Sequence, residues 1–295
     1  MPRSHRLVAA LALGLGALAA SARAQEGPGV TVANDLVYAK VGPAELKLDL
    51  ARPAGGDGPF PAVLVIHGGA WRGGDKAGNR PALAEFARHG YVAISPQYRF
   101  CPGETFPAQV HDVKAAVRWL RSRRDEYKID ADHIGAVGFS AGGHLALMLG
   151  VTGPGDGLEG DAPSGGPGSK VQAVVNYFGP TDLAADDMPE ASKSFVRDFL
   201  GGTPAERPEA AAKASPLTFV TADDPPILTF QGTKDNLVPY TQAEKLTAAM
   251  AKAGVAGRTE LMLGAGHGWG GAELERTRAE TFAFFDRHLK PRGGK

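Results

Sequence analysis

The stretch GFSAGG, residues 138–143, decides the fold, because it places Ser140 between a predicted strand and a predicted helix. Residues 134–137 before it are apolar and short enough for a buried strand, and residues 144–149 after it favour a helix. A serine flanked by small residues on such a tight turn fits the nucleophile elbow of a hydrolase. Its hydroxyl is then exposed at the strand end, near the positive end of the following helix. The pattern alone also fits a plain glycine-rich turn, so the choice between the two interpretations depends on the rest of the chain.

Outward from this stretch, short apolar runs alternate with amphipathic segments. This rhythm predicts an α/β fold with a mostly parallel central sheet and helices on both faces. A segment over residues 179–220 interrupts the rhythm and is predicted as a small insertion after the sixth strand, and residues 153–170 are predicted as a long surface loop. Strands are predicted at residues 31–41, 45–51, 62–66, 91–95, 134–137, 171–177, 226–231 and 259–263, and helices at 81–89, 108–123, 192–200, 204–213, 241–253 and 272–289.

Three strand ends deliver Ser140, Asp235 and His267, in this chain order. Ligands bind beyond the carboxyl ends of the strands in an open parallel sheet, so these residues are expected to meet there. The order is that of an α/β-hydrolase triad. Serine needs a base to take its proton, the imidazole returns that proton to the leaving alcohol, and a carboxylate holds the imidazole in the correct tautomer. Asp182, which follows another strand end, is the rival acid.

The run HGGAW, residues 67–71, follows the strand at 62–66 and predicts an oxyanion hole. The backbone N–H groups of Gly69 and Ala70 are expected to join that of Ala141 around the developing negative charge. Trp71 and Trp269 lie next to the predicted hole and base in the sequence, so they are expected to line the substrate pocket. The remaining candidate histidines are interpreted as structural: His111, His133 and His144.

Composition excludes several classes of partner. The 295-residue chain has 32 Lys+Arg and 32 Asp+Glu, so no basic excess favours a nucleic acid or an anionic membrane surface. The single cysteine, Cys101, cannot form an internal disulfide. No cluster with metal-ligand spacing and no phosphate-binding glycine loop is present in the sequence, so no metal and no cofactor are expected.

Residues 1–24 read as an export signal. Arg3 and Arg6 precede an apolar run at residues 7–20, and the small residues Ala22 and Ala24 mark a cleavage site before Gln25. A membrane anchor is the alternative, but the apolar run is short for a bilayer span. We therefore expect a secreted or periplasmic protein with one catalytic domain over residues 25–295.

The ordered motifs resemble those of α/β-hydrolase esterases grouped around bifunctional feruloyl and acetyl-xylan esterases, close to the hormone-sensitive-lipase-like carboxylesterases. The resemblance runs from about residue 46 to 288, and it rests on HGGAW (67–71), PAQVHD (107–112), GFSAGGH (138–144), FGPTD (178–182), GTKD (232–235) and GHG (266–268). It implies hydrolysis of carboxylic esters without a cofactor, on a small-molecule or polysaccharide-linked substrate. Ala70 departs from the third glycine usual in the lipase-like relatives.

Several functions remain open beside a cell-wall esterase. The resemblance also allows a general carboxylesterase or lipase-like enzyme and a prolyl-oligopeptidase-like peptidase, although no large extra domain is visible. The insertion is not especially apolar, so short-chain esters are expected rather than long-chain lipids. Kynurenine formamidases share H-G-G-x-W but act in the cytosol, and a binding module on a hydrolase scaffold usually lacks a triad member.

Overall fold

The structure, a computed structural model, describes residues 25–27, 29–161 and 166–290. Within them, nine strands form one sheet in the order β1-β2-β3-β5-β4-β6-β7-β8-β9. The strands are β1 (Gln25–Gly27), β2 (Val30–Val41), β3 (Ala44–Pro53), β4 (Phe60–Ile66), β5 (Val92–Pro96), β6 (Ile129–Phe139), β7 (Ala173–Tyr177), β8 (Ile227–Gly232) and β9 (Gly257–Met262). The predicted signal at residues 1–24 lies outside the described residues.

The sheet is mostly parallel, as predicted. Strands β5, β4, β6, β7, β8 and β9 pair in parallel, whereas β1, β2 and β3 pair antiparallel at one edge. The predicted α/β-hydrolase fold class is thereby confirmed. All parallel strands end at the same side, which brings the ends of β4, β6, β8 and β9 together.

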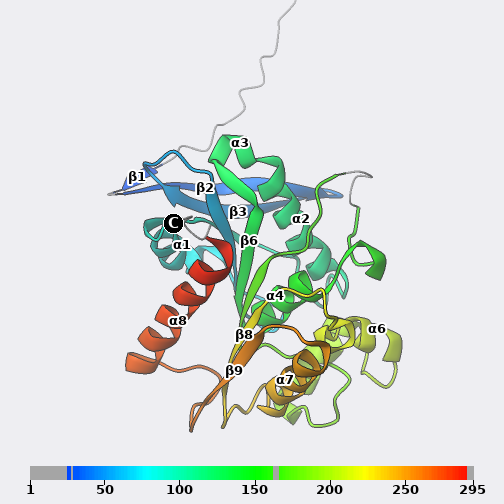
Figure 1. The fold of residues 1–295 in the computed structure, drawn as a ribbon. Helices are drawn as coiled ribbons and strands as arrows, with labels where there is room; N and C mark the ends of the chain where they lie inside the picture. Colours follow the sequence, from blue (N-terminus) through cyan, green and yellow to red (C-terminus); the bar gives the residue numbers. More distant parts are fainter. Residues whose placement is uncertain (1–24, 28, 162–165, 291–295) are drawn as a thin grey trace, which may run out of the picture.

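Helices cover both faces of the sheet (Figure 1). Helices α1 (Arg80–Arg88) and α8 (Gly271–Leu289) lie on one face, and α2 (Ala108–Ser122), α4 (Ala141–Val151) and α7 (Thr241–Ala253) lie on the other. The short α3 (Arg124–Tyr127) follows α2. Single 3-10 turns lie at Lys76–Asn79 and Pro154–Asp156.

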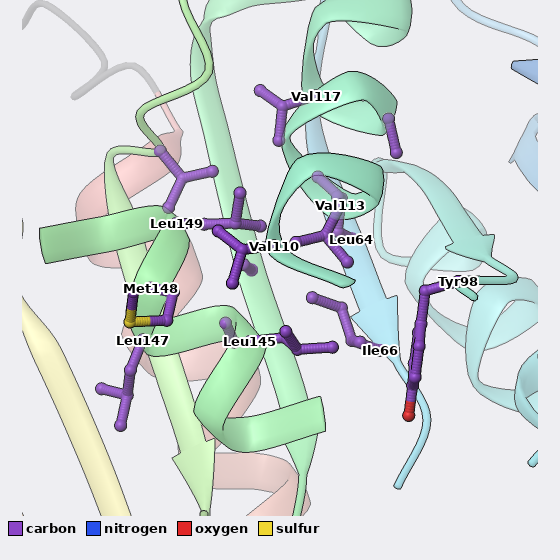
Figure 2. Packing of buried hydrophobic residues seen from close by; sticks show 14 of the residues in the cluster. Leu64, Ile66, Tyr98, Val110, Val113, Val117, Leu145, Leu147, Met148 and Leu149 are labelled. Carbon is purple, nitrogen blue, oxygen red and sulfur yellow. The ribbon is translucent and has the colours of Figure 1, made fainter. Parts of the chain in front are cut away.

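The core follows from strands that are apolar on both faces. Successive side chains of a strand point to opposite sides, so Leu64 and Ile66 of β4 face α2 and α4, while Val63 and Val65 face α1 and α8. Figure 2 shows the α2–α4 side, where Val110, Val113 and Val117 of α2 approach the leucines of α4. Every residue of α4 is buried. The helix that follows Ser140 is therefore held at the centre of the molecule.

The insertion over residues 179–220 follows β7, the strand that the sequence predicts as the sixth. It becomes the seventh because the structure adds the short β1. The insertion contains α5 (Glu190–Leu200), α6 (Pro208–Lys213) and a 3-10 turn at Pro216–Phe219. Its apolar side chains Val196, Phe199 and Leu200 are buried against the main core. The insertion is thus packed on the domain at the carboxyl ends of the strands.

The described part of the 153–170 segment is anchored, although the sequence predicts a surface loop. Leu158 is buried. Glu159 accepts hydrogen bonds from Lys114 at 2.8 Å and from Arg118 at 2.8 Å. Both cations belong to α2. The apolar positions of that helix predict how it packs on the sheet, but they do not predict these ion pairs. Over the described ranges, no helix is long and apolar enough to cross a membrane.

Candidate active site

Ser140 occupies the sharp turn between β6 and α4. Its backbone has φ 54° and ψ −121°. Residues other than glycine rarely adopt this backbone conformation, which costs on the order of 1–3 kcal/mol. The turn is held from both directions: the Ser140 N–H donates to the Tyr177 carbonyl at 2.9 Å, and its carbonyl accepts from the His144 N–H at 3.0 Å. The strained turn predicted from GFSAGG is present.

The two outer glycines of the motif are required by close packing. A Cβ atom on Gly138 would meet the carbonyl group of Gly142, and one on Gly142 would meet the carbonyl oxygens of Ile66 and His67. These are backbone atoms, which cannot move aside cheaply. The motif therefore has small residues because the turn lies directly against the end of β4.

Ser140, His267 and Asp235 meet at the carboxyl ends of β6, β9 and β8. The Oγ of Ser140 lies 2.9 Å from Nε2 of His267, and Nδ1 of His267 lies 2.8 Å from Oδ2 of Asp235. A carboxylate can only accept, so Nδ1 carries the proton and Nε2 is left to accept the serine hydroxyl. The arrangement has the geometry that serine activation needs.

The Asp235 carboxylate is fixed by the loop that carries it. Its Oδ1 accepts from the backbone N–H groups of Leu237 at 2.8 Å and Val238 at 2.9 Å. Its Oδ2 accepts from Nε2 of Gln231 at 3.1 Å, beside the bond from His267. Sequence reasoning missed Gln231. Its signal was a long polar side chain near the end of the buried strand β8.

The rival acid, Asp182, lies elsewhere. Its carboxylate pairs with Lys245 at 3.1 Å and accepts from the Ala184 N–H at 3.2 Å. It therefore closes a turn of the insertion against α7. His133 pairs with Asp130 at 2.8 Å, outside the site.

The HGGAW loop has the backbone conformation of a tight, inward-turned segment. Gly69, Ala70 and Trp71 have φ values of 119°, 52° and 57°. The value at Ala70 lies in the region that favours glycine, which accounts for the glycine that the resemblance leads one to expect there. The Gly69 carbonyl accepts from the Arg72 N–H at 2.9 Å, closing the loop.

The three residues expected to supply oxyanion donors line one cavity together with Ser140. Gly69, Ala70 and Ala141 all line the cavity that contains the Ser140 side chain. Ala141 is the first residue of α4, and the N–H groups of a helix's first turn have no partner within the helix. These N–H groups are therefore placed where an anion can use them.

The two tryptophans that are expected to line the substrate pocket lie in different places. Trp71 lines the cavity, and its Nε1–H donates to Nδ1 of the buried His144 at 3.2 Å. Trp269 does not line it. Its indole N–H donates to Thr277 at 3.1 Å, and its ring packs edge-on against Phe178. The structure thus places the Trp269 indole against α8 and outside the lining of the Ser140 cavity, because the chain turns after His267.

His144 links the HGGAW loop to the insertion. Besides accepting from Trp71, it donates from Nε2 to the Ala214 carbonyl at 2.7 Å. Complete burial lowers its pKa from 6.5 to about 4, so the imidazole is neutral near pH 7. The interpretation of His144 as a packed histidine agrees with this environment.

The cavity at Ser140 has a volume of about 420 Å³ and a mostly apolar lining. Side chains of the insertion form one wall, through Met188, Ser192, Phe195 and Val196. The lining contains no Asp, Glu, Lys or Arg, and His267 is its only titratable side chain among the described residues. The cavity therefore suits an uncharged group. No group of three or more His, Cys, Asp and Glu in the described ranges is placed to hold a metal ion.

Comparison with known proteins adds a family. The BD-FAE family model matches residues 48–250, which is most of the chain. The chain belongs to the BD-FAE family of α/β-hydrolase esterases. The broader part of the predicted resemblance is thereby confirmed.

Among its relatives in sequence, Esterase LipC of Mycobacterium tuberculosis is 35% identical over 238 residues, which cover 77% of this chain and 58% of LipC. The chain spans about half the length of the curated relatives it matches. The predicted enzyme class, a carboxylic ester hydrolase, is the class of these relatives.

Solved structures give the same result for this BD-FAE member. A truncated carbohydrate esterase from gut microbiota superposes with a TM-score of 0.74 and 30% identity, covering 87% of this chain and 96% of that one. The thermophilic esterase Est2 of Thermogutta terrifontis also has a TM-score of 0.74, with 29% identity over 90% of this chain and 96% of that one. Est2 has been solved with propionate or butyrate bound and phosphonylated by sarin.

Proposed function

We propose that the protein is an exported serine esterase that hydrolyses short-chain or aryl carboxylic esters through an acyl-enzyme on Ser140. The observation that carries the proposal is the chain of contacts Ser140–His267–Asp235, at 2.9 and 2.8 Å, beside an apolar cavity. Acyl transfer from an ester needs a nucleophile, a base and an acid in this arrangement.

The first half of the reaction forms the acyl-enzyme. The Oγ of Ser140 attacks the ester carbonyl carbon while Nε2 of His267 takes its proton. The carbonyl oxygen becomes negative and is stabilised by the N–H groups of Gly69, Ala70 and Ala141, of which each donor is typically worth about 3 kcal/mol of barrier. The imidazolium then gives its proton to the alcohol oxygen as the C–O bond breaks.

The second half returns the enzyme to its starting state. Water attacks the acyl-serine, and His267 takes a proton from that water. The acyl C–O bond to Ser140 breaks, and His267 returns the proton to the serine oxygen. Asp235 stabilises the imidazolium in both halves and remains a carboxylate.

The size and chemistry of the cavity support an uncharged acyl group of modest length. Its volume of about 420 Å³ is in the range of small-molecule sites, and its lining is largely apolar. Est2, solved with propionate or butyrate bound, is a neighbour in structure. We infer that short acyl groups, or an aryl group such as a feruloyl, fit this chain in the same way.

We further propose that the natural esters are acetyl or feruloyl groups on plant cell-wall polysaccharide. The signal-like residues 1–24 favour a substrate outside the cytoplasm. The structural likeness to a carbohydrate esterase is compatible with a sugar alcohol as the leaving group. The alternative is a general carboxylesterase, which the likeness to Esterase LipC favours.

The test is hydrolysis of acetylated xylan, methyl ferulate and p-nitrophenyl acetate by residues 25–295, with Ser140→Ala alongside. Release of acetate or ferulate that vanishes in the variant is expected. Activity on p-nitrophenyl acetate alone would select the general carboxylesterase. Hydrolysis that survives in Ser140→Ala, or no hydrolysis of any ester, would overturn the serine-esterase proposal.

A further inference from the structure

A second cavity lies beside the cavity at Ser140. It has a volume of about 250 Å³ and belongs entirely to the insertion after β7. Met188 and Val196 line both cavities, so these two side chains form the partition between them. The other lining residues are Leu183, Ala184, Ala185, Asp186, Lys193, Thr203, Pro204 and Ala205.

Val196 belongs to α5, which crosses the site, and Met188 precedes this helix. Near its start, Ser192 donates to the Leu237 carbonyl at 2.7 Å, on the side of Asp235. Near its end, the ring of Phe199 stacks on the ring of Trp71, on the side of the HGGAW loop, with 4.3 Å between the ring centroids. Val196 lies between these two anchors.

The direction of the acyl group follows from the chemistry. His267 has to reach the alcohol oxygen of the ester, so the alcohol lies toward His267. The acyl group then extends away from it, along α5 and toward Trp71. This path leads to the partition.

One of the two residues of the partition is adaptable. Met188 and Val196 are 7% and 3% exposed, so they are packed in place. A methionine side chain is unbranched and changes rotamer readily, whereas valine is stiff about its only side-chain torsion. Beyond them, the second cavity has an apolar inner wall and an exposed rim with Asp186 and Lys193.

We propose that Met188 and Val196 set the length of acyl chain that the Ser140 cavity accepts, and that the second cavity is a distal subsite for the ends of longer acyl chains. A chain of modest length stops at the partition. A longer chain reaches the distal subsite only when Met188 turns aside or when the partition is cut back. This inference rests on the proposed esterase function.

The experiment measures kcat/KM for p-nitrophenyl acetate, butyrate, octanoate and decanoate with the wild type and with Val196→Ala. We expect the wild type to favour the short esters. In Val196→Ala, the ratio of kcat/KM for octanoate to kcat/KM for acetate should rise about tenfold or more. Each methylene group that becomes buried in an apolar site raises kcat/KM about fourfold. Met188→Ala should shift the same ratio in the same direction.

Val238→Ala is the matched control. Val238 lines the Ser140 cavity and is 5% exposed, but it does not line the second cavity. The same loss of two methyl groups there should leave the ratio of octanoate to acetate within about twofold of the wild type. An equal gain in Val238→Ala would show that any enlargement suffices and would overturn the proposal.

A double variant tests whether the gain uses the second cavity. Ala205 lines that cavity only and is exposed. Val196→Ala combined with Ala205→Trp should lose the gain, because the indole fills the space beyond the partition. Retention of the gain would overturn the distal subsite.

A series of alkyl acetates distinguishes the acyl from the alcohol side. Val196→Ala should change kcat/KM little across butyl, hexyl and octyl acetate. A gain confined to these alcohols would overturn the acyl assignment. Failure of the esterase function itself is seen separately, as p-nitrophenyl acetate hydrolysis that is absent or that survives Ser140→Ala.

Discussion

At the scale of single residues, the hydrogen bonds around Asp235 decide which carboxylate can serve His267. Asp235 accepts from His267 and from the backbone of its own loop, while Asp182 is engaged with Lys245. The two aspartates therefore offer a direct comparison. Both follow strand ends, and only their tertiary contacts separate them.

Asp235→Asn should lower kcat by about four orders of magnitude with little change in thermal stability. The amide of the asparagine donates a hydrogen bond to Nδ1 of His267, so the imidazole proton moves to Nε2. A protonated Nε2 can no longer accept the hydroxyl proton of Ser140. The measurement is kcat for p-nitrophenyl acetate together with the unfolding temperature. Asp182→Asn is the control and should keep most of the activity. The opposite pattern would assign the acid to Asp182.

His144→Gln should reduce the acid sensitivity of the fold. The pKa of His144 is lowered to about 4, so the folded state resists protonation, and stability present above pH 6.5 is lost as the pH falls toward 4. Glutamine can keep both hydrogen bonds without titrating. Between pH 7 and pH 5, the free energy of unfolding of the wild type should fall by about 2 kcal/mol more than that of the variant. Equal losses in urea titrations at the two pH values would contradict this.

At the scale of elements, α5 of the insertion is tied to the HGGAW loop. Arg72 follows that loop, pairs with Asp198 at 2.6 Å, donates to the Ser194 carbonyl at 2.6 Å and lies over the Phe195 ring. Trp71 stacks on Phe199 of the same helix. The helix that walls the cavity and the loop that carries the expected oxyanion donors are thus one packed unit.

Arg72→Met should lower kcat by about tenfold to a hundredfold, because small displacements of positioned groups are costly to the transition state. Methionine keeps the apolar stem and loses the ion pair with α5. Arg197→Met is the control: Arg197 neighbours the same Asp198 at 3.8 Å but is largely exposed. It should retain nearly wild-type kcat. Similar losses in both variants would point to the charge of Asp198 rather than to the tie between loop and helix.

The anchor of the 153–170 segment makes a prediction about stability. Lys114 is fully buried, and Glu159 supplies its counter-charge. Glu159→Ala leaves the ammonium group uncompensated and should cost about 3 kcal/mol in the free energy of unfolding. Glu275→Ala, which removes an exposed pair with Arg278, should cost less than about 1 kcal/mol. Chemical denaturation of the three proteins checks this, and equal costs would show that the buried pair adds nothing.

At the scale of the whole molecule, one sheet brings together residues that are far apart in the chain. The carboxyl ends of β4, β6, β8 and β9 supply the HGGAW loop, Ser140, Asp235 and His267. The insertion covers this edge and forms one wall of the cavity. The rest of the molecule supports this edge with a two-sided apolar core.

Export is a prediction about the whole chain. Expressed in full length in a bacterial host, the protein should be recovered outside the cytoplasm with Gln25 as its first residue. Leu13→Arg breaks the apolar run and should leave an uncut chain inside the cell. Mass spectrometry of the purified protein checks both. An intact N-terminus on exported protein would favour the membrane-anchor alternative.

The sequence by itself determined the sheet, the order of its elements and the candidate residues. Short apolar runs and amphipathic helices are local patterns, and the small residues of GFSAGG indicate a strand-to-helix turn without any knowledge of what packs against it. Strand ends of a parallel sheet lie at one edge by topology, so Ser140, Asp235 and His267 could be predicted to meet.

Only the tertiary structure decided what surrounds these residues. Trp71 lines the cavity and Trp269 does not, although each follows a site residue closely, because side-chain direction depends on turns that the pattern does not encode. Gln231 acts within the loop that carries Asp235, whereas Arg72 and the cavity wall of the insertion act through contacts between distant segments. Such contacts are set by packing in three dimensions, and no periodicity along the chain records them.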